Sequence, residues 1–580
     1  MYKYALILLL IFFSVETKIF AQEKTYKILI ADSANIKFSP KKTIQKKPNY
    51  LNNNSLSINY LLLDFYNQGY ITATIDSITD KVEESTIYIR AGEQYKLKHL
   101  LPGNLDEEIL SYLKYNKKLF SLKTFKYPEI ENLLIKTINY YENNGYPFAS
   151  IKLDSVEIND GSISAKINLN KNHKVVIDSI IINGSKKTNP VFIYNYIGIS
   201  PGDLYDESKI KKIKNRLNEL QFLNQTKPLE LSFGKNENKL NLFLEDRKAS
   251  QFNGIIGALP DNNNPSKILF TGDAFFKLQN TLARGELFEF NWRKLQSQTQ
   301  DLKIQIVYPF ILNTPFGIDY KLSIYKRDTT FLTVNNNLGI QYWLKGGNYL
   351  KAFIQNKTST GLSTKSIENY KPATDIADIS ARNYGLEIKK DLYDYRFNPR
   401  KGYSFIVSAS AGTRKIISNS ILNQSAKNNI DLKSAQYNGE INLEYYIPFF
   451  NKTTLKISSK SAYLIGKTLF NNELFRIGGL KTLRGFDEES IFASSYSILN
   501  IEYRYLLEQN SYFHVFWNGA YYESKTLNSS TKDKPYGFGM GISFESKPGI
   551  FSISYALGKE FENPILIRAG KVHFGFVSYF

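Results

Sequence analysis

The chain has 580 residues, of which 14% are aromatic and 22% charged, with a formal charge of +20 at pH 7 and no cysteine. The lack of cysteine excludes disulfides, thiolate metal sites, a cysteine nucleophile and lipid attachment at an N-terminal cysteine. The basic residues form no block with interleaved aromatics, which argues against a nucleic-acid partner. The charge is consistent with a general abundance of lysine along the chain, and attraction to anionic lipid head groups is the alternative.

The first 21 residues are typical of a secretory signal peptide. Lys3 gives a positive start, the apolar run from Ala5 to Phe13 is too short to span a membrane, and Ala21 precedes a plausible cleavage site. A buried helix or an uncleaved anchor is the alternative. The signal peptide predicts a mature chain that begins near Gln22 and acts outside the cytosol.

One pattern recurs three times between residues 25 and 247: a strand, a helical stretch that ends near a glycine, and two further strands. The predicted helices are Leu56 to Tyr66, Ile130 to Glu142 and Glu207 to Leu220, and the third unit is predicted to open with a strand at 175–182. We therefore expect three small α+β modules at 22–93, 94–172 and 173–247. Three unrelated small domains are the alternative.

From residue 251 to 580 the pattern changes to alternating apolar and polar residues in stretches of about ten. The predicted strands are 252–259, 268–277, 284–294, 301–309, 316–327, 333–344, 348–356, 382–390, 402–413, 436–447, 453–465, 496–507, 512–523, 536–546, 549–559 and 570–580. An even count of sixteen predicts a closed antiparallel transmembrane β-barrel, whose closure removes the sheet edges that hydrocarbon cannot satisfy. A soluble β-sandwich is the alternative.

The alternation also predicts which side chains face the lumen. Leu499, Ile501 and Tyr503 share one side of a strand, and Glu502 and Arg504 share the other. In a barrel that crosses lipid, the apolar side faces outward and the polar side faces a wet lumen.

The segment from Phe475 to Phe486 reads F-R-I-G-G-L-K-T-L-R-G-F between two strand-like runs. The Gly478-Gly479 pair permits backbone angles that other residues rarely adopt. Arg484 offers five donors in a fixed geometry and a charge that resists neutralisation. If the segment lies inside the barrel, Arg484 needs a partner, because an unpaired buried charge is costly.

Catalytic patterns are missing from the sequence. It contains no Gly-x-Ser-x-Gly elbow, no His-Glu-x-x-His and no phosphate-binding Gly-x-x-x-x-Gly-Lys loop, and His99, His173, His514 and His573 have no metal-ligand spacing. We therefore predict that the chain is not an enzyme and holds no cofactor or metal. The glycines from Gly537 to Gly541 indicate a strand where other structure packs close to the backbone.

Together these motifs resemble the outer-membrane assembly factor family of the BamA/TamA type. Segment 475–486 is similar to its Arg-Gly-Phe loop, residues 91–97 and 198–205 are similar to junctions in its POTRA modules, and Asn398 to Gly402 resembles its mid-barrel turn. Three modules before sixteen strands resemble the TamA arrangement most. The resemblance implies a barrel in the bacterial outer membrane with its N-terminal part in the periplasm.

The resemblance also implies a loop that folds back into the lumen. Its motif residues here are Gly478, Gly479, Arg484, Gly485 and Phe486. Family members usually hold the arginine with an aspartate two residues before a glycine on a following strand, and Trp517 occupies that position in this chain. We therefore expect Glu502, or else Glu440 or Glu444, to bind Arg484.

The final strand resembles the terminal recognition signal of bacterial barrel proteins, with Phe574, Phe576 and Phe580 on one side. A plain closing strand is equally consistent with these residues. We expect the barrel to open where this strand meets the first one, at a seam weakened by Gly570 and Gly575.

The implied function is the assembly, insertion or translocation of proteins at the outer membrane. The expected partners are unfolded outer-membrane or secreted proteins, outer-membrane lipid, and a periplasmic or inner-membrane-anchored protein on the modules. Clients are expected to pair with module strand edges, for instance around Thr86 to Arg90. A two-partner-type secretion pore for one dedicated substrate, a passive channel and a barrel-anchored hydrolase are the alternatives.

Overall fold

The computed structural model describes residues 25–30, 54–80, 84–121, 123–261, 264–296, 298–362, 376–395, 397–417, 431–527, 529–561 and 565–580. The predicted signal peptide lies outside these residues. The chain divides into two compact units, one comprising Met1–Val176 with Leu204–Glu207 and the other Ile177–Asp203 with Ser208–Phe580. Among the described residues, no helix is both long and apolar enough to cross a bilayer.

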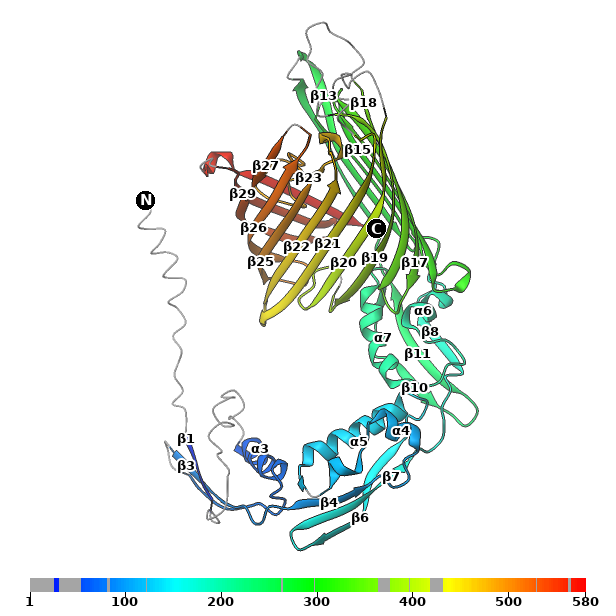
Figure 1. Cartoon of the computed structure of the whole chain (residues 1–580), viewed down its shortest axis with the longest axis vertical. Helices are drawn as coiled ribbons and strands as arrows, with labels where there is room; N and C mark the ends of the chain where they lie inside the picture. The colour runs from blue at the N-terminus through cyan, green and yellow to red at the C-terminus, as the bar shows by residue number, and fades with distance from the viewer. Residues whose placement is uncertain are drawn as a thin grey trace. The chain divides into compact units, whose positions relative to one another are not determined.

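The first unit holds two small α+β modules, each with one sheet (Figure 1). The first sheet contains β1 (Thr25–Ile30), β2 (Thr74–Asp80) and β3 (Glu84–Arg90), beside helix α3 (Asn54–Asn67). Its order is β1-β3-β2, so β3 is the central strand. The expectation that Thr86 to Arg90 form an exposed edge is therefore wrong, because both sides of β3 are already paired.

The second sheet has the order β5-β4-β7-β6. Its strands β4 and β7 pair in parallel, as β1 and β3 do in the first sheet. Its elements are β4 (Lys96–Leu101), α4 (Glu107–Tyr112), η3 (Lys117–Phe120), β5 (Lys123–Thr124), α5 (Tyr127–Glu142), β6 (Ser150–Asn159) and β7 (Ser162–Asn170). Helix α5 buries Ile130, Leu133, Thr137 and Tyr141 against this sheet, which explains its helical periodicity. Helix α4 was not predicted.

The third module opens the second unit. Its elements are β8 (Ser179–Gly184), α6 (Pro190–Ile197), α7 (Glu207–Glu219), β9 (Leu223–Gln225), β10 (Glu230–Phe233) and β11 (Asn238–Asp246). The predicted opening strand at 175–182 starts too early. Val175 and Ile177 are apolar because they are buried in a loop, and β8 begins only at Ser179.

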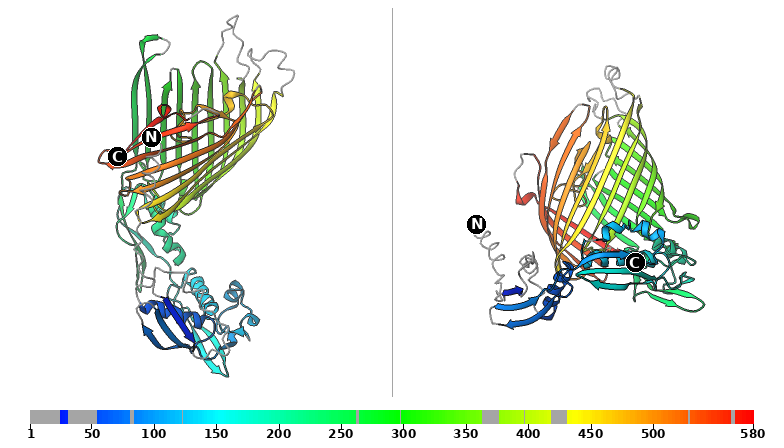
Figure 2. Two further views of the ribbon diagram at one scale, coloured as in Figure 1. Left: turned by 90° about the vertical axis from the view of Figure 1, so that its left-hand side faces the viewer. Right: turned by 60° about the horizontal axis from the view of Figure 1, so that its bottom comes forward.

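Sixteen antiparallel strands close the barrel when the short β27 is counted with β28 as one interrupted strand (Figures 1 and 2). They are β12 (Gln251–Asp261), β13 (Asn264–Gln279), β14 (Leu287–Gln296), β15 (Thr299–Tyr308), β16 (Phe316–Arg327), β17 (Phe331–Trp343), β18 (Tyr349–Gly361), β19 (Asp378–Tyr393), β20 (Gly402–Ile417), β21 (Lys433–Phe450), β22 (Thr453–Gly466), β25 (Ser495–Leu506), β26 (Tyr512–Lys525), β27 (Ser530–Asp533) with β28 (Tyr536–Ser546), β29 (Gly549–Lys559) and β30 (Lys571–Tyr579). The predicted fold class is therefore confirmed.

Several strands are longer than the ten residues expected. β21 has 18 residues, and β13, β19 and β20 have 16 each. The prediction counted only the stretch in which apolar residues alternate, which is the part a bilayer requires. The strands continue beyond it as a polar ladder, for example where Lys415 pairs with Lys433.

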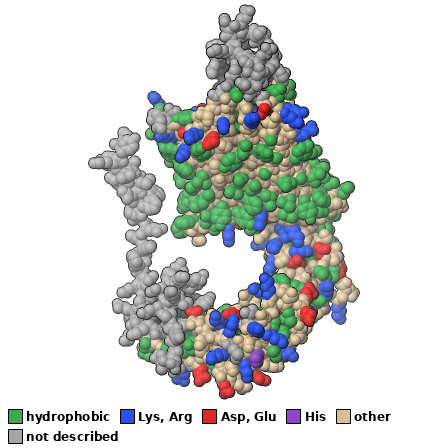
Figure 3. All heavy atoms as spheres, viewed as in Figure 1, with side chains coloured by type: hydrophobic (Ala, Val, Ile, Leu, Met, Phe, Trp, Pro, Cys, Tyr) green, Lys and Arg blue, Asp and Glu red, His purple; other side chains and the backbone are tan. Residues whose placement is uncertain are grey.

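The two faces of the barrel wall differ as the alternation predicts. On β25, Leu499, Ile501 and Tyr503 are exposed on the outside, whereas Glu502 and Arg504 are buried inside. Hydrophobic side chains cover the outer wall of the barrel on the side shown in Figure 3. An apolar outer band around a polar interior is the arrangement that lipid requires.

Candidate functional site in the barrel lumen and at the seam

The lumenal loop, residues 467–494, joins β22 to β25. It contains η5 (Asn471–Glu473) and a small hairpin of β23 (Phe475–Ile477) and β24 (Ile491–Ala493). Ile477, Leu483, Phe486 and Ile491 of the loop are buried in one apolar cluster with side chains of the barrel wall. The loop is therefore packed inside the barrel.

Two glycines make the turn that brings Arg484 inward. Gly478 and Gly479 have φ angles of 116° and 92°, in the region that favours glycine. The Thr482 hydroxyl donates to the Gly478 carbonyl at 2.8 Å, and the Gly479 amide donates to the Leu483 carbonyl at 3.0 Å. These bonds close the turn just before Arg484.

Arg484 is held by three polar side chains and one ring. Its Nη1 lies 2.8 Å from Glu502 Oε2, its Nη2 3.1 Å from Asn500 Oδ1 and its Nε 3.3 Å from Asn518 Oδ1. The guanidinium carbon lies 3.5 Å from the centre of the Phe516 ring. Breaking such a buried pair typically costs about 3–5 kcal/mol, so this contact fixes the loop.

Glu502 also binds a second arginine. Arg504 Nε lies 2.7 Å from Glu502 Oε1, and Arg504 Nη1 donates to Asn398 Oδ1 at 2.7 Å. Asn398 belongs to the turn between β19 and β20. A continuous polar chain therefore links Arg484 of the loop to this turn through Glu502 and Arg504.

The other two candidate partners lie elsewhere in the lumen. Glu444 accepts a hydrogen bond from the Tyr393 hydroxyl at 3.1 Å and pairs with Lys456 at 3.2 Å. Glu440 lines a cavity of about 530 Å³ together with Lys481 of the loop. The structure therefore brings Glu502, and neither of these two, to Arg484.

Trp517 does not contact Arg484 from the lumenal side of the wall. Its side chain is 41% exposed on the outer face of β26, in line with Phe513 and Val515, whereas Asn518 points into the lumen. The motif comparison was wrong by one residue, because a shift of one position moves a side chain to the other face of a strand. The contacts of Arg484 with Asn518, Asn500 and Phe516 were not predicted, although the alternation places all three side chains on the lumenal face.

Two strand glycines form the floor beneath the loop tip. Gly537 of β28 lies opposite Gly558 of β29. A Cβ on Gly537 would lie 2.2 Å from the Arg484 carbonyl oxygen, and one on Gly558 would lie 2.6 Å from that of Gly485. The close approach expected from the glycine run is therefore the approach of the Arg484-Gly485 backbone.

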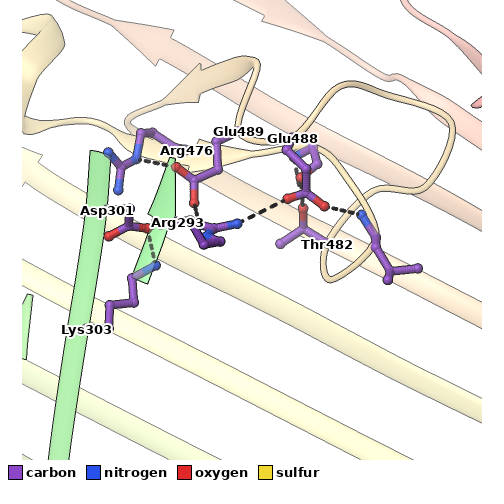
Figure 4. A network of polar contacts seen from close by, with 9 residues as sticks. Arg293, Asp301, Lys303, Arg476, Thr482, Glu488 and Glu489 are labelled. Atoms are coloured by element: carbon purple, nitrogen blue, oxygen red, sulfur yellow. Dashed lines mark hydrogen bonds and ion pairs between the residues drawn. The ribbon is translucent and has the colours of Figure 1, made fainter. Parts of the chain in front are cut away.

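The loop continues into an acidic segment, Asp487 to Glu489, whose side chains contact strand β14 of the barrel wall. Glu489 pairs with Arg293 of β14 and lies 3.2 Å from Arg476 of the loop, and Glu488 lies 3.6 Å from Arg293 (Figure 4). Asp301 of β15 holds Arg293 from the other side at 2.8 Å. This contact was not predicted.

A second buried ion pair fixes the start of the loop. Glu473 accepts two hydrogen bonds from Arg414 of β20, at 2.6 and 2.7 Å, and both side chains are almost fully buried. Its backbone carbonyl accepts from Lys357 at 2.9 Å. The loop is thus held at Glu473, at Arg484 and at the acidic segment.

The seam between the first and last strands is short. β12 pairs with β13 along its length, but with β30 only at Gln251–Tyr579 and Phe252–Ser578. Gly570 lies just before β30, and Gly575 lies in the part of β30 that is not paired with β12. Weakening of the seam by these two glycines stays a prediction.

The three terminal phenylalanines have ring partners on neighbouring strands. Phe574 and Phe576 contact Phe551 of β29, with ring centres 6.3 and 4.5 Å apart. Phe580 stacks on Phe276 of β13 at 5.9 Å. These contacts explain the residues as part of a closing strand, and a signal function remains a prediction.

An aromatic cluster lies at the paired end of the seam. The Arg247 guanidinium, between the third module and β12, lies 4.9 Å from the centre of the Phe397 ring, and Phe397 contacts Tyr579 at 5.2 Å. Phe397 belongs to the turn between β19 and β20. This cluster joins the end of the third module, the turn between β19 and β20, and the last strand of the barrel.

The third module is fixed to further turns at the same end of the barrel. Glu219 of α7 accepts hydrogen bonds from the Gly347 amide and the Tyr196 hydroxyl, both at 3.1 Å. Phe192 of α6 packs against Phe310 with ring centres 5.7 Å apart. The module and the barrel are therefore one continuous structure. Within the described residues, no cluster of His, Asp or Glu side chains is arranged to hold a metal ion.

Family comparisons agree with this geometry. The Omp85 superfamily domain model matches residues 229–576, and the POTRA model (surface antigen variable number repeat) matches residues 175–245. The chain is similar to the outer membrane protein assembly factor BamA of Nitratidesulfovibrio vulgaris, with 25% identity over 170 residues, 27% of this chain and 21% of that protein. The chain therefore spans about a fifth of the length of that relative.

Two further similarities cover most of the chain. The heme/hemopexin transporter protein HuxB of Haemophilus influenzae is 22% identical over 497 residues, which are 80% of this chain and 83% of that protein. The solved structures of CdiB from Acinetobacter baumannii and from Escherichia coli have TM-scores of 0.52 and 0.53. Each is 12% identical and covers 91% of this chain and 98% of its own, which shows a shared fold.

Proposed function

Because the chain belongs to the Omp85 superfamily, we propose that it inserts other proteins into the bacterial outer membrane. It is an outer-membrane protein whose POTRA-like modules lie in the periplasm. The finer steps, the clients and the partners described below are parts of the same proposal.

The short seam is the observation that carries the proposal. Beyond Phe252 and before Ser578, the facing edges of β12 and β30 are not paired with each other. Unpaired strand edges are templates for another strand, and within hydrocarbon their backbone groups require partners. An incoming client strand supplies such partners, so the seam is the place where insertion begins.

The modules supply further strand edges for client capture. β6 of the second module has ten residues, and within the described residues it pairs on one side only, with β7. Val156 and Ile158 near its end are about half exposed. An extended client segment gains backbone hydrogen bonds along such an edge and side-chain contacts from the apolar residues.

Photocrosslinking tests this step. A crosslinking residue at Glu157 of β6 is expected to capture unfolded barrel proteins. The matched control is Lys166, which is exposed on the central strand β7 of the same sheet and offers no free edge. Equal capture at both positions would contradict capture by strand pairing.

A secretion pore for a dedicated substrate is the second candidate. The similarity to HuxB spans most of both proteins, whereas the similarity to BamA spans a fifth of that protein. A polypeptide that crossed the lumen would have to displace the lumenal loop from Glu502 and Arg414.

Depletion of the protein, followed by quantification of outer-membrane and secreted proteins, separates the two candidates. Loss of many barrel proteins is expected for an assembly factor, and loss of one secreted protein for a pore. Unchanged levels of both would exclude both functions.

A further inference from the structure

The acidic segment of the lumenal loop contacts strands on both sides of the seam. Asp487 Oδ1 lies 2.8 Å from Lys571 Nζ of β30, and Glu488 and Glu489 bind Arg293 of β14. β30 is the last strand of the barrel, and β14 is the third in order from the other side. Three consecutive carboxylates therefore connect the two walls that meet at the seam.

This connection lies away from the paired end of the seam. Backbone pairing joins β12 to β30 at Tyr579 and Ser578, whereas Lys571 stands at the other end of β30. Tyr579 follows Lys571 by eight positions in the strand, roughly 26 Å of extended chain. The unpaired part of the seam is thus bridged from inside by the loop.

The two contacts differ in strength. Arg293 is mostly buried between Asp301, Glu488 and Glu489, and Figure 4 shows its guanidinium pointing at both glutamates. Charge-assisted hydrogen bonds in such a setting are among the stronger ones. Asp487 and Lys571 are more exposed, so their pair is weaker and more easily broken.

We infer that the segment Asp487 to Glu489 positions the loop as a brace across the seam, with Arg293 and Lys571 as its two receiving residues. The weak contact with Lys571 releases first when β30 moves, while the contact with Arg293 keeps the loop on the β14 side. This inference deepens the proposed function, since it names the residues that control the same seam.

Distance measurement across the seam tests the brace directly. The chain has no cysteine, so Ile306→Cys on β15 and Val572→Cys on β30 provide two unique spin-label sites. Both side chains are exposed on the outer wall, on opposite sides of the seam. Double electron–electron resonance on the full chain in lipid nanodiscs then reports the distance between them.

Four variants, each carrying both spin labels, are compared with the labelled parent. Arg293→Gln and Asp487→Lys are each expected to add a population at longer distance that the parent lacks. The double swap Asp487→Lys with Lys571→Asp is expected to restore the parental distribution, because it rebuilds the pair with reversed charges. The control Lys277→Gln removes a lumenal ion pair with Glu289 that does not involve the loop, and is expected to change nothing.

Parental distributions in both single variants would overturn the inference, and so would a swap that fails to restore the distance. If Arg293→Gln does not fold, the exposed Asp487–Lys571 pair decides the question alone. The measurement needs no client, so its failure is distinguishable from failure of the depletion experiment.

Discussion

Gly537 of β28 and Gly558 of β29 lie opposite each other beneath the backbone of Arg484 and Gly485. Replacing either with alanine places a methyl group within 2.2 to 2.6 Å of a backbone carbonyl oxygen of the loop. We expect the loop tip to lift and the free energy of unfolding to fall by about 1–3 kcal/mol, as overpacking usually costs.

Limited proteolysis of the loop and denaturant unfolding measure these effects. Gly439→Ala on β21 is the matched control, since a Cβ there meets its nearest atom only at 4.0 Å. Loss of stability in Gly439→Ala equal to that in Gly537→Ala would show that strand flexibility, and not the loop, explains the effect.

Glu502→Gln removes the one carboxylate that Arg484 and Arg504 share. Both guanidinium groups then stay buried without their counter-charge. We therefore expect the free energy of unfolding to fall by about 3–5 kcal/mol and the loop to become accessible to protease. Denaturant unfolding in detergent measures the free energy, and protease digestion measures the accessibility of the loop. Trp517→Leu, on the outer face of the next strand, is expected to leave the loop protected. A protected loop in Glu502→Gln would contradict the role of this pair.

The second module is predicted to lose stability in acid through Asp106. The hydrogen bond with Lys171, at 2.7 Å, lowers the pKa of the Asp106 carboxyl below its ordinary value of 3.8. The unfolded chain therefore binds this proton more tightly, so the stabilisation is complete above about pH 4 and disappears as the pH falls through the lowered folded pKa.

Hydrogen exchange of α4 at about pH 7 and about pH 3 measures this loss. Asp106 also caps α4 by accepting the Ile109 amide, and Asp106→Asn keeps that cap while it removes the charge. We expect the variant to show no extra loss of protection in acid. The same loss in the variant and the parent would assign the effect to other carboxylates.

Glu219→Gln is predicted to loosen the third module from the barrel. The carboxylate accepts the Gly347 amide and the Tyr196 hydroxyl, and hydrogen bonds to charged groups contribute about 1.5–3 kcal/mol. Faster hydrogen exchange at Gly347 is the expected result. Glu230→Gln, at an exposed position on β10 of the same module, is the control and is expected to leave that exchange rate unchanged.

The barrel was predictable because successive residues of a strand alternate between its two faces, so the polarity of each residue indicates the face it occupies. Leu499 and Ile501 outside and Glu502 inside follow from a period of two, which needs no knowledge of the partner strand. The same rule would have placed Asn518 beside Arg484. Trp517 shares the outer face of β26 with Phe513 and Val515, so a motif position defined by its distance from a glycine does not identify the face of the strand.

Contacts between distant segments had no comparable signal. Arg414 and Glu473 are 59 residues apart, and Arg414 lies one residue beyond the predicted end of its strand. Arg293 and Glu489 are 196 residues apart. Charge alone allows many pairings among so many lysines, arginines and carboxylates, so only the closed barrel decides which of them meet.

Within the described part of the chain, the two α-helices that were not predicted, α4 and α6, are short. α6 buries Phe192, Ile193, Tyr196 and Ile197, so its apolar residues do not form one narrow stripe. Its start was nevertheless marked by Asn189 and Pro190, a capping residue followed by a proline at the first helical position. α4 was similarly marked by Asp106, whose side chain caps the helix.

The cluster of Arg247, Phe397 and Tyr579 joins segments that lie far apart in the sequence. Arg247 donates a hydrogen bond to the hydroxyl of Tyr395, 148 residues later in the chain, and Tyr579 lies later still, on β30. Closing loops of this length costs chain entropy before the contact is gained. Loss of the Tyr579 ring therefore removes the contact by which the last strand reaches Phe397 and, through it, Arg247 beside the third module.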